Sequence, residues 1–259
     1  MAGTKKELLV MVSKAISVDF AQDPLSEFRE IKDLIVIGPA EWKKAVRGGG
    51  YKNRNPLCLS QNWCPCPQVP YSVEQMRQLV ELSKAPEWNT RVVLWLALPK
   101  VGGVLTSLMG QSELWGIAHD NLVGGQVRSD PFWSNWFVEH RYPCALEPAV
   151  TEPTWLVGYE LPRWTIMYCF SYQQKLARDR EMSIMTASQY ALMCNLLAIN
   201  GVWFHERTWS RTSSILGGCP LGVGWYSGYG LGIDRRWVPE GVDGRVGASV
   251  EGVPFELGS

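Results

Sequence analysis

The chain has 259 residues, of which 46% are hydrophobic and 19% are charged, so it can bury a substantial core. Lys plus Arg and Asp plus Glu both number 25, and this zero formal net charge argues against a nucleic-acid-binding protein. No apolar run approaches the roughly 18 residues of a membrane helix, and no signal peptide is recognised. We therefore expect a cytoplasmic protein or a component of a particle, with no membrane partner.

Helical and extended patterns alternate in the first part of the chain. Residues 4–16, 24–32 and 40–46 are expected to form short helices. Between the last two, Leu34–Ile37 has the apolar character of a buried strand. Residues 51–70 contain four prolines and are expected to form a loop.

A well-marked helix and a strand follow this loop. Ser72 and Gln75 have the spacing of a capping box, in which each side chain bonds the backbone N–H of the other residue. The helix is expected to end near Lys84, and residues 91–98 to form a strand that Pro99 stops. This order of elements predicts an α+β fold for the N-terminal region.

The middle of the chain suggests a division into two domains. Residues 155–159 and 165–170 are apolar and extended in pattern, and they predict a hairpin. The polar stretch 173–181 is the best candidate for a domain boundary. We therefore expect an α+β region over 1–180 and a second domain over 181–259.

The clearest helix of the chain opens the second domain. Thr186 and Gln189 form a capping box, and Asn200 precedes a glycine that can end the helix. Apolar residues at helical spacing predict one buried face, made of Tyr190, Ala191, Cys194, Leu197 and Ala198. Closely spaced glycines after this helix predict short strands and tight turns.

Aromatic and charged residues gather in this glycine-rich segment. Aromatic faces together with Arg and Asp can bind a planar, sugar or protein ligand by stacking and charge-assisted hydrogen bonds. The alternative is that the tryptophans, 13 in the whole chain, form core and the other residues only line loops. The candidate ligand-binding residues are Trp209, Arg211, Trp225, Tyr226, Tyr229, Asp234, Arg235, Arg236 and Trp237.

Three cysteines lie close together, at Cys58, Cys64 and Cys66. A zinc site needs thiolates or imidazoles that converge tetrahedrally, and it often uses Cys-x2-Cys pairs. The spacing here differs from that pattern and no second pair follows, so we expect reduced thiols and no bound metal, with a structural metal as the alternative. The seven cysteines of the chain fit a reducing compartment better than a disulfide framework.

Recognisable catalytic motifs are missing from the sequence. It contains no Gly-x-Ser-x-Gly, no phosphate-binding loop, and no helix after its Gly-x-Gly pairs of the kind a dinucleotide site requires. The three histidines are His119, His140 and His205, and only the His119–Asp120 pair suggests acid–base chemistry. We expect no cofactor.

Three segments of the second domain carry a resemblance to a known family. They are Thr-Ala-Ser-Gln-Tyr at 186–190, Trp-Ser-Arg-Thr at 209–212, and the Gly- and Trp-rich run from 223 to 249. Together they resemble the C-type-lectin-like fold of formylglycine-generating-enzyme-type domains and of the variable proteins of diversity-generating retroelements. The resemblance implies a C-terminal domain rich in irregular loops, and a bacterial or phage origin.

The resemblance implies a binding module and not the enzyme of that family. The oxidising cysteines of the enzyme have no counterpart here, because Cys219 stands alone in the C-terminal region. The ligand-facing surface would lie around residues 222–237. We expect a non-catalytic protein that binds a protein or glycan. The alternatives are a metal-dependent hydrolase that uses His119, Asp120 or the three clustered cysteines, and a structural subunit of a larger, phage-like assembly whose Trp-rich surface is an oligomer contact.

Overall fold

A computed structural model describes residues 23–48, 64–114, 143–204, 208–227, 230–234, 239–254 and 257. Within these residues the fold is α+β, with seven α-helices and three sheets, which confirms the predicted class. The predicted helix over residues 4–16 lies outside the described part of the chain. No helix among the described residues is long and apolar enough to cross a bilayer.

Helices and strands are mixed along the chain. The helices are α2 (Ser26–Arg29), α3 (Pro39–Gly48), α4 (Val73–Ser83), α5 (Leu108–Leu114), α7 (Pro143–Leu146), α8 (Phe170–Arg178) and α9 (Ala187–Ile199), with a 3-10 turn, η2 (Arg163–Thr165). The strands are β1 (Leu34–Ile37), β2 (Val92–Ala97), β3 (Lys100–Val101), β4 (Val104–Leu105), β5 (Thr154–Tyr159), β6 (Ser183–Ile184), β7 (Trp209–Leu216), β8 (Cys219–Ser227), β9 (Gly230–Asp234), β10 (Val246–Ala248) and β11 (Val250–Glu251).

The largest sheet has five strands in the order β1-β2-β5-β11-β6. Strand β1 runs parallel to β2, with Leu34 opposite Val92, and β5 runs antiparallel to β2. Every residue of β2 is buried, because this strand is covered on both faces. That double burial explains why its sequence is a continuous apolar run and not an alternating one.

A four-stranded sheet in the order β10-β7-β8-β9 forms the second layer. The hairpin β7–β8 turns at Gly217 and Gly218, both at positive φ. Strand β10 returns beside β7 in parallel, with Val246 opposite Trp209. The short pair β3–β4 forms the third sheet.

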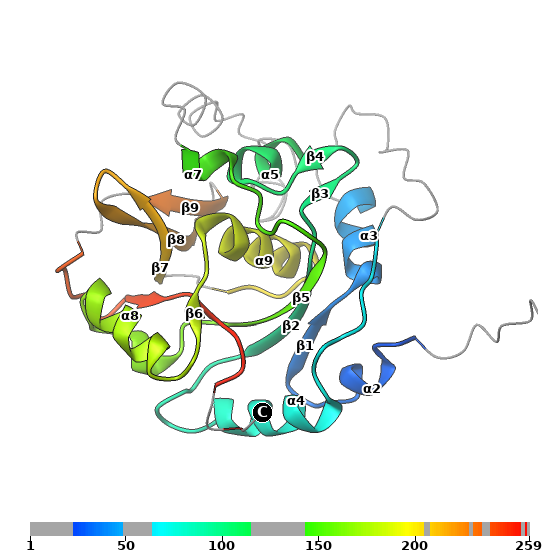
Figure 1. The fold of residues 1–259 in the computed structure, drawn as a ribbon, viewed down its shortest axis with the longest axis horizontal. Coiled ribbons are helices and arrows are strands. Elements are labelled where there is room, and N and C mark those ends of the chain that lie inside the picture. The colour runs from blue at the N-terminus through cyan, green and yellow to red at the C-terminus, as the bar shows by residue number, and fades with distance from the viewer. Residues whose placement is uncertain are drawn as a thin grey trace, which may run out of the picture.

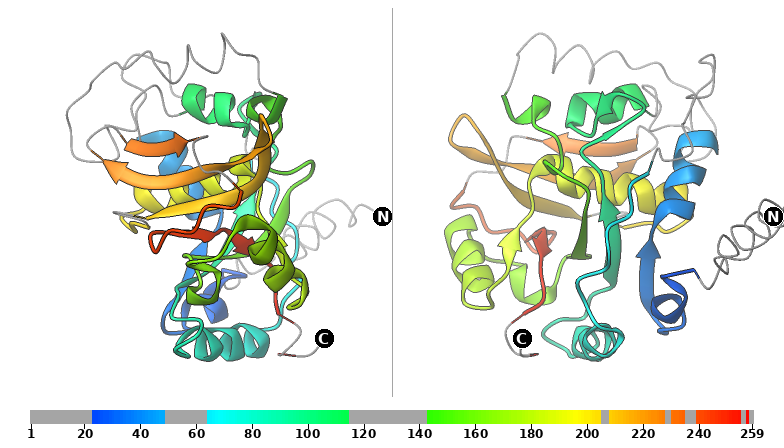
Figure 2. Two further views of the ribbon diagram at one scale, coloured as in Figure 1. Left: turned by 90° about the vertical axis from the view of Figure 1, so that its left-hand side faces the viewer. Right: turned by 45° about the vertical axis from the view of Figure 1, so that its right-hand side comes forward.

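Helix α9 lies between the two larger sheets, and Figures 1 and 2 show it at the centre of the molecule. All of its 13 residues except Gln189 and Ile199 are buried. The expectation of a single apolar face was therefore too narrow, because α9 packs against elements on all sides. Inside the core the Asn195 amide donates to Gln111 (3.0 Å) and Gln111 donates to the Ser188 carbonyl (2.8 Å), while the Asn195 side-chain oxygen has no partner among the described residues.

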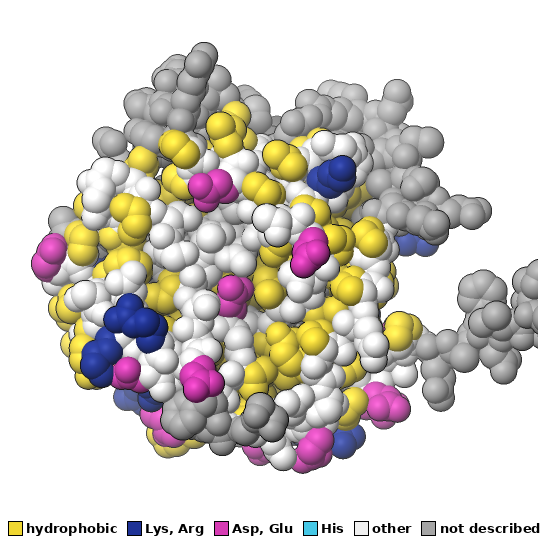
Figure 3. Space-filling view, viewed as in Figure 1, with side chains coloured by type: hydrophobic (Ala, Val, Ile, Leu, Met, Phe, Trp, Pro, Cys, Tyr) yellow, Lys and Arg dark blue, Asp and Glu magenta, His cyan; other side chains and the backbone are white. Residues whose placement is uncertain are grey.

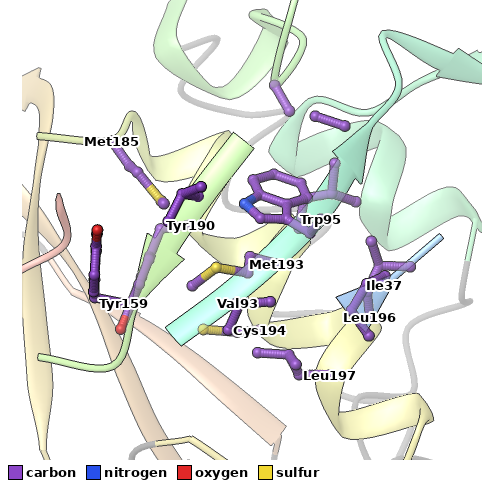
Figure 4. Close-up of a cluster of buried hydrophobic side chains, with 14 of the residues drawn as sticks. Ile37, Val93, Trp95, Tyr159, Met185, Tyr190, Met193, Cys194, Leu196 and Leu197 are labelled. Carbon is purple, nitrogen blue, oxygen red and sulfur yellow. The ribbon is translucent and has the colours of Figure 1, made fainter. Parts of the chain in front are cut away.

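The core around α9 is closely packed. Figure 4 shows Val93 and Trp95 of β2 beside Met193, Cys194 and Leu197 of α9. Gly158 of β5 makes room for two methionines, since a Cβ atom there would lie 2.5 Å from the Met193 sulfur. A small residue on β5 is thus required where the helix meets the sheet.

Several local predictions are confirmed and one is wrong. Both capping boxes are present, at Ser72 of α4 and Thr186 of α9, with their predicted glutamine partners. The hairpin expected from residues 155–159 and 165–170 does not form. Strand β5 pairs with β2 instead, and the second segment makes η2, a turn and the start of α8.

The predicted boundary near residue 180 stays a prediction. The polar stretch 173–181 forms most of α8 and the turn after it. Strands β6 and β11, which follow the boundary, pair with each other, and β11 also pairs with β5, which precedes it. Segments from both sides of residue 180 therefore share one sheet.

Candidate functional site

Four exposed apolar or aromatic side chains lie at the start of α8 and on the loop that contains Val242. Met167, Tyr168 and Tyr172 are 62%, 41% and 42% exposed, and Val242 is 58% exposed. The two tyrosine rings lie together, with their centroids 4.9 Å apart. We call these four residues the tyrosine patch. Exposed apolar patches on soluble proteins mark interaction sites when they are large.

The chain before α8 is bent to expose these side chains. Residues 163–165 form the 3-10 turn η2, and Met167 then adopts a φ of 66°. That region is unfavourable for a residue with a side chain, and burial offers no compensation here because Met167 is exposed. Helix α8 starts directly afterwards, with Cys169 at its N-cap. The bend therefore places Tyr168 and Tyr172 on either side of the helix start.

Arg211 holds the backbones of the start of α8 and of the Val242 loop from inside the protein. This residue of β7 is fully buried, and its guanidinium donates to the carbonyl oxygens of Tyr168 (2.9 Å) and Gly241 (2.6 Å). A longer contact of 3.4 Å reaches the side-chain oxygen of Gln173. The Phe170 N–H also bonds the Pro239 carbonyl across the loops (2.7 Å). One guanidinium thus holds both backbones that carry the tyrosine patch.

Among the described residues, the Arg211 guanidinium is contacted by carbonyl oxygens and forms no ion pair with a carboxylate. Its Nε has no hydrogen-bond partner among them. Burial lowers the pKa of its guanidinium, and this effect is opposed by nearby Cys169 and Asp243. A buried arginine held by carbonyl oxygens is costly to desolvate, so its position is strongly specified by the loops around it.

Cys169 lies at this site, and its surroundings lower the pKa of its thiol. Its Sγ lies 3.4 Å from the Ser171 hydroxyl. This hydrogen bond, the Tyr172 backbone N–H and the charge of Arg211 lower the pKa of the thiol. Cys169 lies between Tyr168 and Tyr172 in the sequence, so the rate at which its thiol reacts reports on the surroundings of the patch.

Arg211 and Trp209 are the two predicted ligand-binding residues whose side chains the structure describes. Arg211 is buried, so its guanidinium contacts the protein's own carbonyls and not the surface. Trp209 is partly exposed on β7, and its ring lies over Gly232 of β9, where a Cβ atom would be 2.7 Å from Cη2. Glycine at this position lets the indole lie flat across the strands.

The structure describes the other predicted ligand-binding residues only in part or not at all. Trp225 and Tyr226 belong to β8 and Asp234 ends β9, but their side chains are not described. Tyr229, Arg235, Arg236 and Trp237 lie outside the described residues. The last three belong to the segment that connects β9 to Pro239, which carries the chain into the Val242 loop.

The candidate metal site is incomplete in the described part of the chain. Cys58 lies outside it, Cys64 is partly exposed and Cys66 is exposed. Burial and the neighbouring Cys66 raise the pKa of the Cys64 thiol to about 12, which disfavours the thiolate that binds metals. No group of three or more metal-ligating side chains occurs among the residues with assigned positions. His119, Asp120, His140 and His205 lie outside them.

A second polar cluster lies at the N-terminal end of α9. Glu251 of β11 accepts long hydrogen bonds of 3.4 and 3.5 Å from the Gln189 amide. Burial raises the pKa of its carboxyl to about 7, although the Gln189 contact opposes that rise. Glu251 also raises the pKa of Tyr71, after the larger effect of burial. Because its pKa is about 7, this carboxyl is close to half-protonated at neutral pH.

Charged side chains of both signs lie near the tyrosine patch. Figure 3 shows Lys and Arg side chains gathered over α8, beside apolar side chains. Lys175 of α8 pairs with Asp179, and Arg245 pairs with Asp243 beside Val242. Paired surface charges of both signs fit a rim around an apolar centre better than an electrostatic binding surface.

No protein-family model, curated protein or solved structure matches this chain. The resemblance to C-type-lectin-like proteins therefore stays a prediction.

Sequence reasoning missed the tyrosine patch because residues 165–170 look like a buried strand. Tyr168, Phe170 and Tyr172 alternate with Cys169 and Ser171, and a period of two is typical of a strand. Only the polar stretch that begins at Gln173 fits the half-exposed helix α8 that forms there. Glu251 carried no sequence signal, because its burial depends on strand pairing across the fold.

Proposed function

We propose that this protein is a non-catalytic binding protein that holds a protein partner at the tyrosine patch. The observation that carries the proposal is the exposure of Met167, Tyr168, Tyr172 and Val242 at the start of α8 and on the Val242 loop, two segments that the buried Arg211 holds through the Tyr168 and Gly241 carbonyls. Rigid aromatic side chains on a braced backbone lose little entropy on binding, which favours affinity. The strained backbone of Met167 supports the same proposal, because such strain is retained where it serves a function.

The composition of the patch favours a protein partner over a glycan. Tyrosine faces suit both ligands, but Met167 and Val242 add aliphatic surface with no hydrogen-bonding group. Sugars need polar side chains that match their hydroxyls, whereas aliphatic and aromatic side chains together form the centre of protein interfaces. The segment with Arg235, Arg236 and Trp237 enters the Val242 loop, and we propose that it extends the binding surface. Of the two groups of C-type-lectin-like proteins that the sequence resembles, this proposal favours the variable proteins.

A peptide selection tests the proposal. A displayed library of random peptides is selected on the intact protein, and a glycan array is probed in parallel. Enriched peptides rich in aromatic and aliphatic residues are expected to lose at least about tenfold in affinity for a Tyr168→Ala/Tyr172→Ala variant. Leu105→Ala is the matched control, because Leu105 is 46% exposed on β4, away from α8 (Figure 1).

Three outcomes would contradict the proposal. Peptide binding that the double variant leaves unchanged would remove the patch as the binding surface. Glycan binding that depends on the two tyrosines would replace the protein partner by a sugar. A patch-dependent change of mass in solution, without peptide binding, would make the surface an oligomer contact of the chain itself.

A further inference from the structure

Strand β11 holds two parts of the large sheet together with very few residues. Glu251 lies opposite Gly158 of β5 on one side and Ser183 of β6 on the other. The Gly252 N–H donates to the Val157 carbonyl, and the Tyr159 hydroxyl donates to the Gly252 carbonyl (2.7 Å). Without this two-residue strand, β6 would have no place in the sheet. The attachment of β6 to the sheet therefore depends on the pairing of β11, in which Glu251 takes part.

The side chain of Glu251 connects this strand to the start of α9. Its two oxygens accept from the Gln189 amide, while the Gln189 side-chain oxygen accepts from the Thr186 N–H (2.7 Å). Gln189 therefore joins the capping box of α9 to β11. The two contacts to Glu251 are long for hydrogen bonds, so they compensate poorly for the burial of a charged carboxylate.

No positive group offsets a charge on Glu251 among the described residues. From the chain before α4, the titratable group that faces it is Tyr71, whose charged form would also be negative. From α9 it meets the neutral Gln189, and its neighbours on β5 and β6 are Gly158 and Ser183. Tyr159 of β5 faces the following residue through its hydroxyl. Ionisation thus places an unpaired charge in partly buried surroundings.

We propose that Glu251 is a pH-sensitive latch for strand β11. Its neutral acid keeps β11 paired with β5 and β6 and in contact with the start of α9, and its carboxylate weakens this attachment. The sign follows from the burial. The neutral acid is favoured in the folded state until the pH reaches about 7, whereas an unfolded glutamate ionises near 4.5. The attachment of β11 is therefore strongest below about pH 4.5, weakens as the pH rises to about 7, and changes little above that pH.

Hydrogen exchange of single amides tests the latch. The amides of Gly252 and Met185 report on β11, because they bond to the Val157 and Ser249 carbonyls. Their protection, corrected for intrinsic exchange rates, is expected to fall at least about tenfold between about pH 5.5 and about pH 8.5. The Met76 amide of α4, which bonds the Ser72 carbonyl, is expected to keep its protection.

Two variants make the result specific. Glu251→Gln keeps the shape and cannot ionise, so its β11 amides are expected to stay protected across the pH range. Glu152→Gln removes an exposed carboxyl and is expected to behave like the unaltered protein. Equal loss of protection in Glu251→Gln and the unaltered protein would overturn the proposal. So would a flat profile in the unaltered protein, or a parallel loss at Met76, which would indicate global unfolding.

Discussion

The guanidinium of Arg211 donates a 2.9 Å hydrogen bond to the carbonyl oxygen of Tyr168, so a fully buried charge supports an exposed tyrosine. The same guanidinium holds Gly241, which precedes the exposed Val242. Arg211, a predicted ligand-binding residue that is buried, thus connects the start of α8 to the Val242 loop. Its contribution to binding would be indirect, through the backbone that it holds.

Replacing Arg211 tests this support. Arg211→Met keeps much of the side-chain volume but leaves the Tyr168 and Gly241 carbonyls without their donor. We expect a loss of about 2–4 kcal/mol in the free energy of unfolding, measured by urea denaturation. Arg245→Met is the control, because Arg245 forms an exposed ion pair with Asp243 and its loss is expected to change the free energy of unfolding much less. Equal effects of the two substitutions would contradict the bracing role.

The glycine at position 224 is expected to tolerate no side chain. Its φ is 157°, and a Cβ atom would lie 2.3 Å from the Thr208 carbonyl oxygen and 2.9 Å from the Trp209 Cα. Backbone atoms cannot rotate away, so Gly224→Ala is expected to cost at least about 2 kcal/mol in thermal or chemical unfolding. Gly244→Ala is the comparison, because its nearest neighbour would be 3.9 Å away. A Gly224→Ala protein as stable as Gly244→Ala would show that β7 and β8 are less close than described.

The sequence predicted the elements whose signals are local. The capping boxes of Ser72 with Gln75 and of Thr186 with Gln189 depend on residues three positions apart, so both helix starts were predictable. Strand β2 was predictable because burial on both faces leaves a continuous apolar run that Pro99 ends. The α+β class follows from these elements alone.

Features that depend on distant partners were not predictable. Residues 165–170 are apolar enough for a strand, but β2 already provides the partner of β5, so this segment turns into α8. The burial of Arg211 depends on carbonyls at 168 and 241, far from it in sequence. The predicted ligand-binding residues Trp209 and Arg211 stay a prediction, and the exposure of Met167 and Tyr172 was not predicted from the sequence.

Cys169 is expected to be the fastest-alkylated described cysteine. The Ser171 hydroxyl, the Tyr172 N–H and Arg211 lower the pKa of its thiol, so it holds more thiolate at neutral pH. Cys194 is fully buried, and burial raises the pKa of its thiol well above the ordinary range. Iodoacetamide labelling followed by peptide mass spectrometry gives the order of reaction.

The serine variant provides the control for this labelling. Ser171→Ala removes the hydroxyl that stabilises the thiolate and is expected to slow labelling of Cys169 several-fold, without changing the exposure of the sulfur. Labelling of Cys194 at the rate of Cys169, or no effect of Ser171→Ala, would contradict the account of this thiol.

Glu251 is expected to make the protein less stable as the pH rises. Its pKa is about 7 in the folded state against an ordinary 4.5, so the folded state binds the proton more tightly. The unfavourable contribution is absent below about pH 4.5 and complete above about pH 7. Glu251→Gln is expected to gain on the order of 2 kcal/mol at about pH 8 and close to nothing at about pH 4.5. Urea unfolding at the two pH values measures both, and equal gains would contradict the assignment.

The most direct measurement of the binding proposal is the affinity of a patch-selected peptide for three proteins, by titration calorimetry. The proteins are the unaltered chain, the Tyr168→Ala/Tyr172→Ala variant and Leu105→Ala. We expect the double variant to weaken binding at least about tenfold and the control to leave it unchanged. Equal affinities for all three proteins would contradict the proposal that the tyrosine patch is the binding surface.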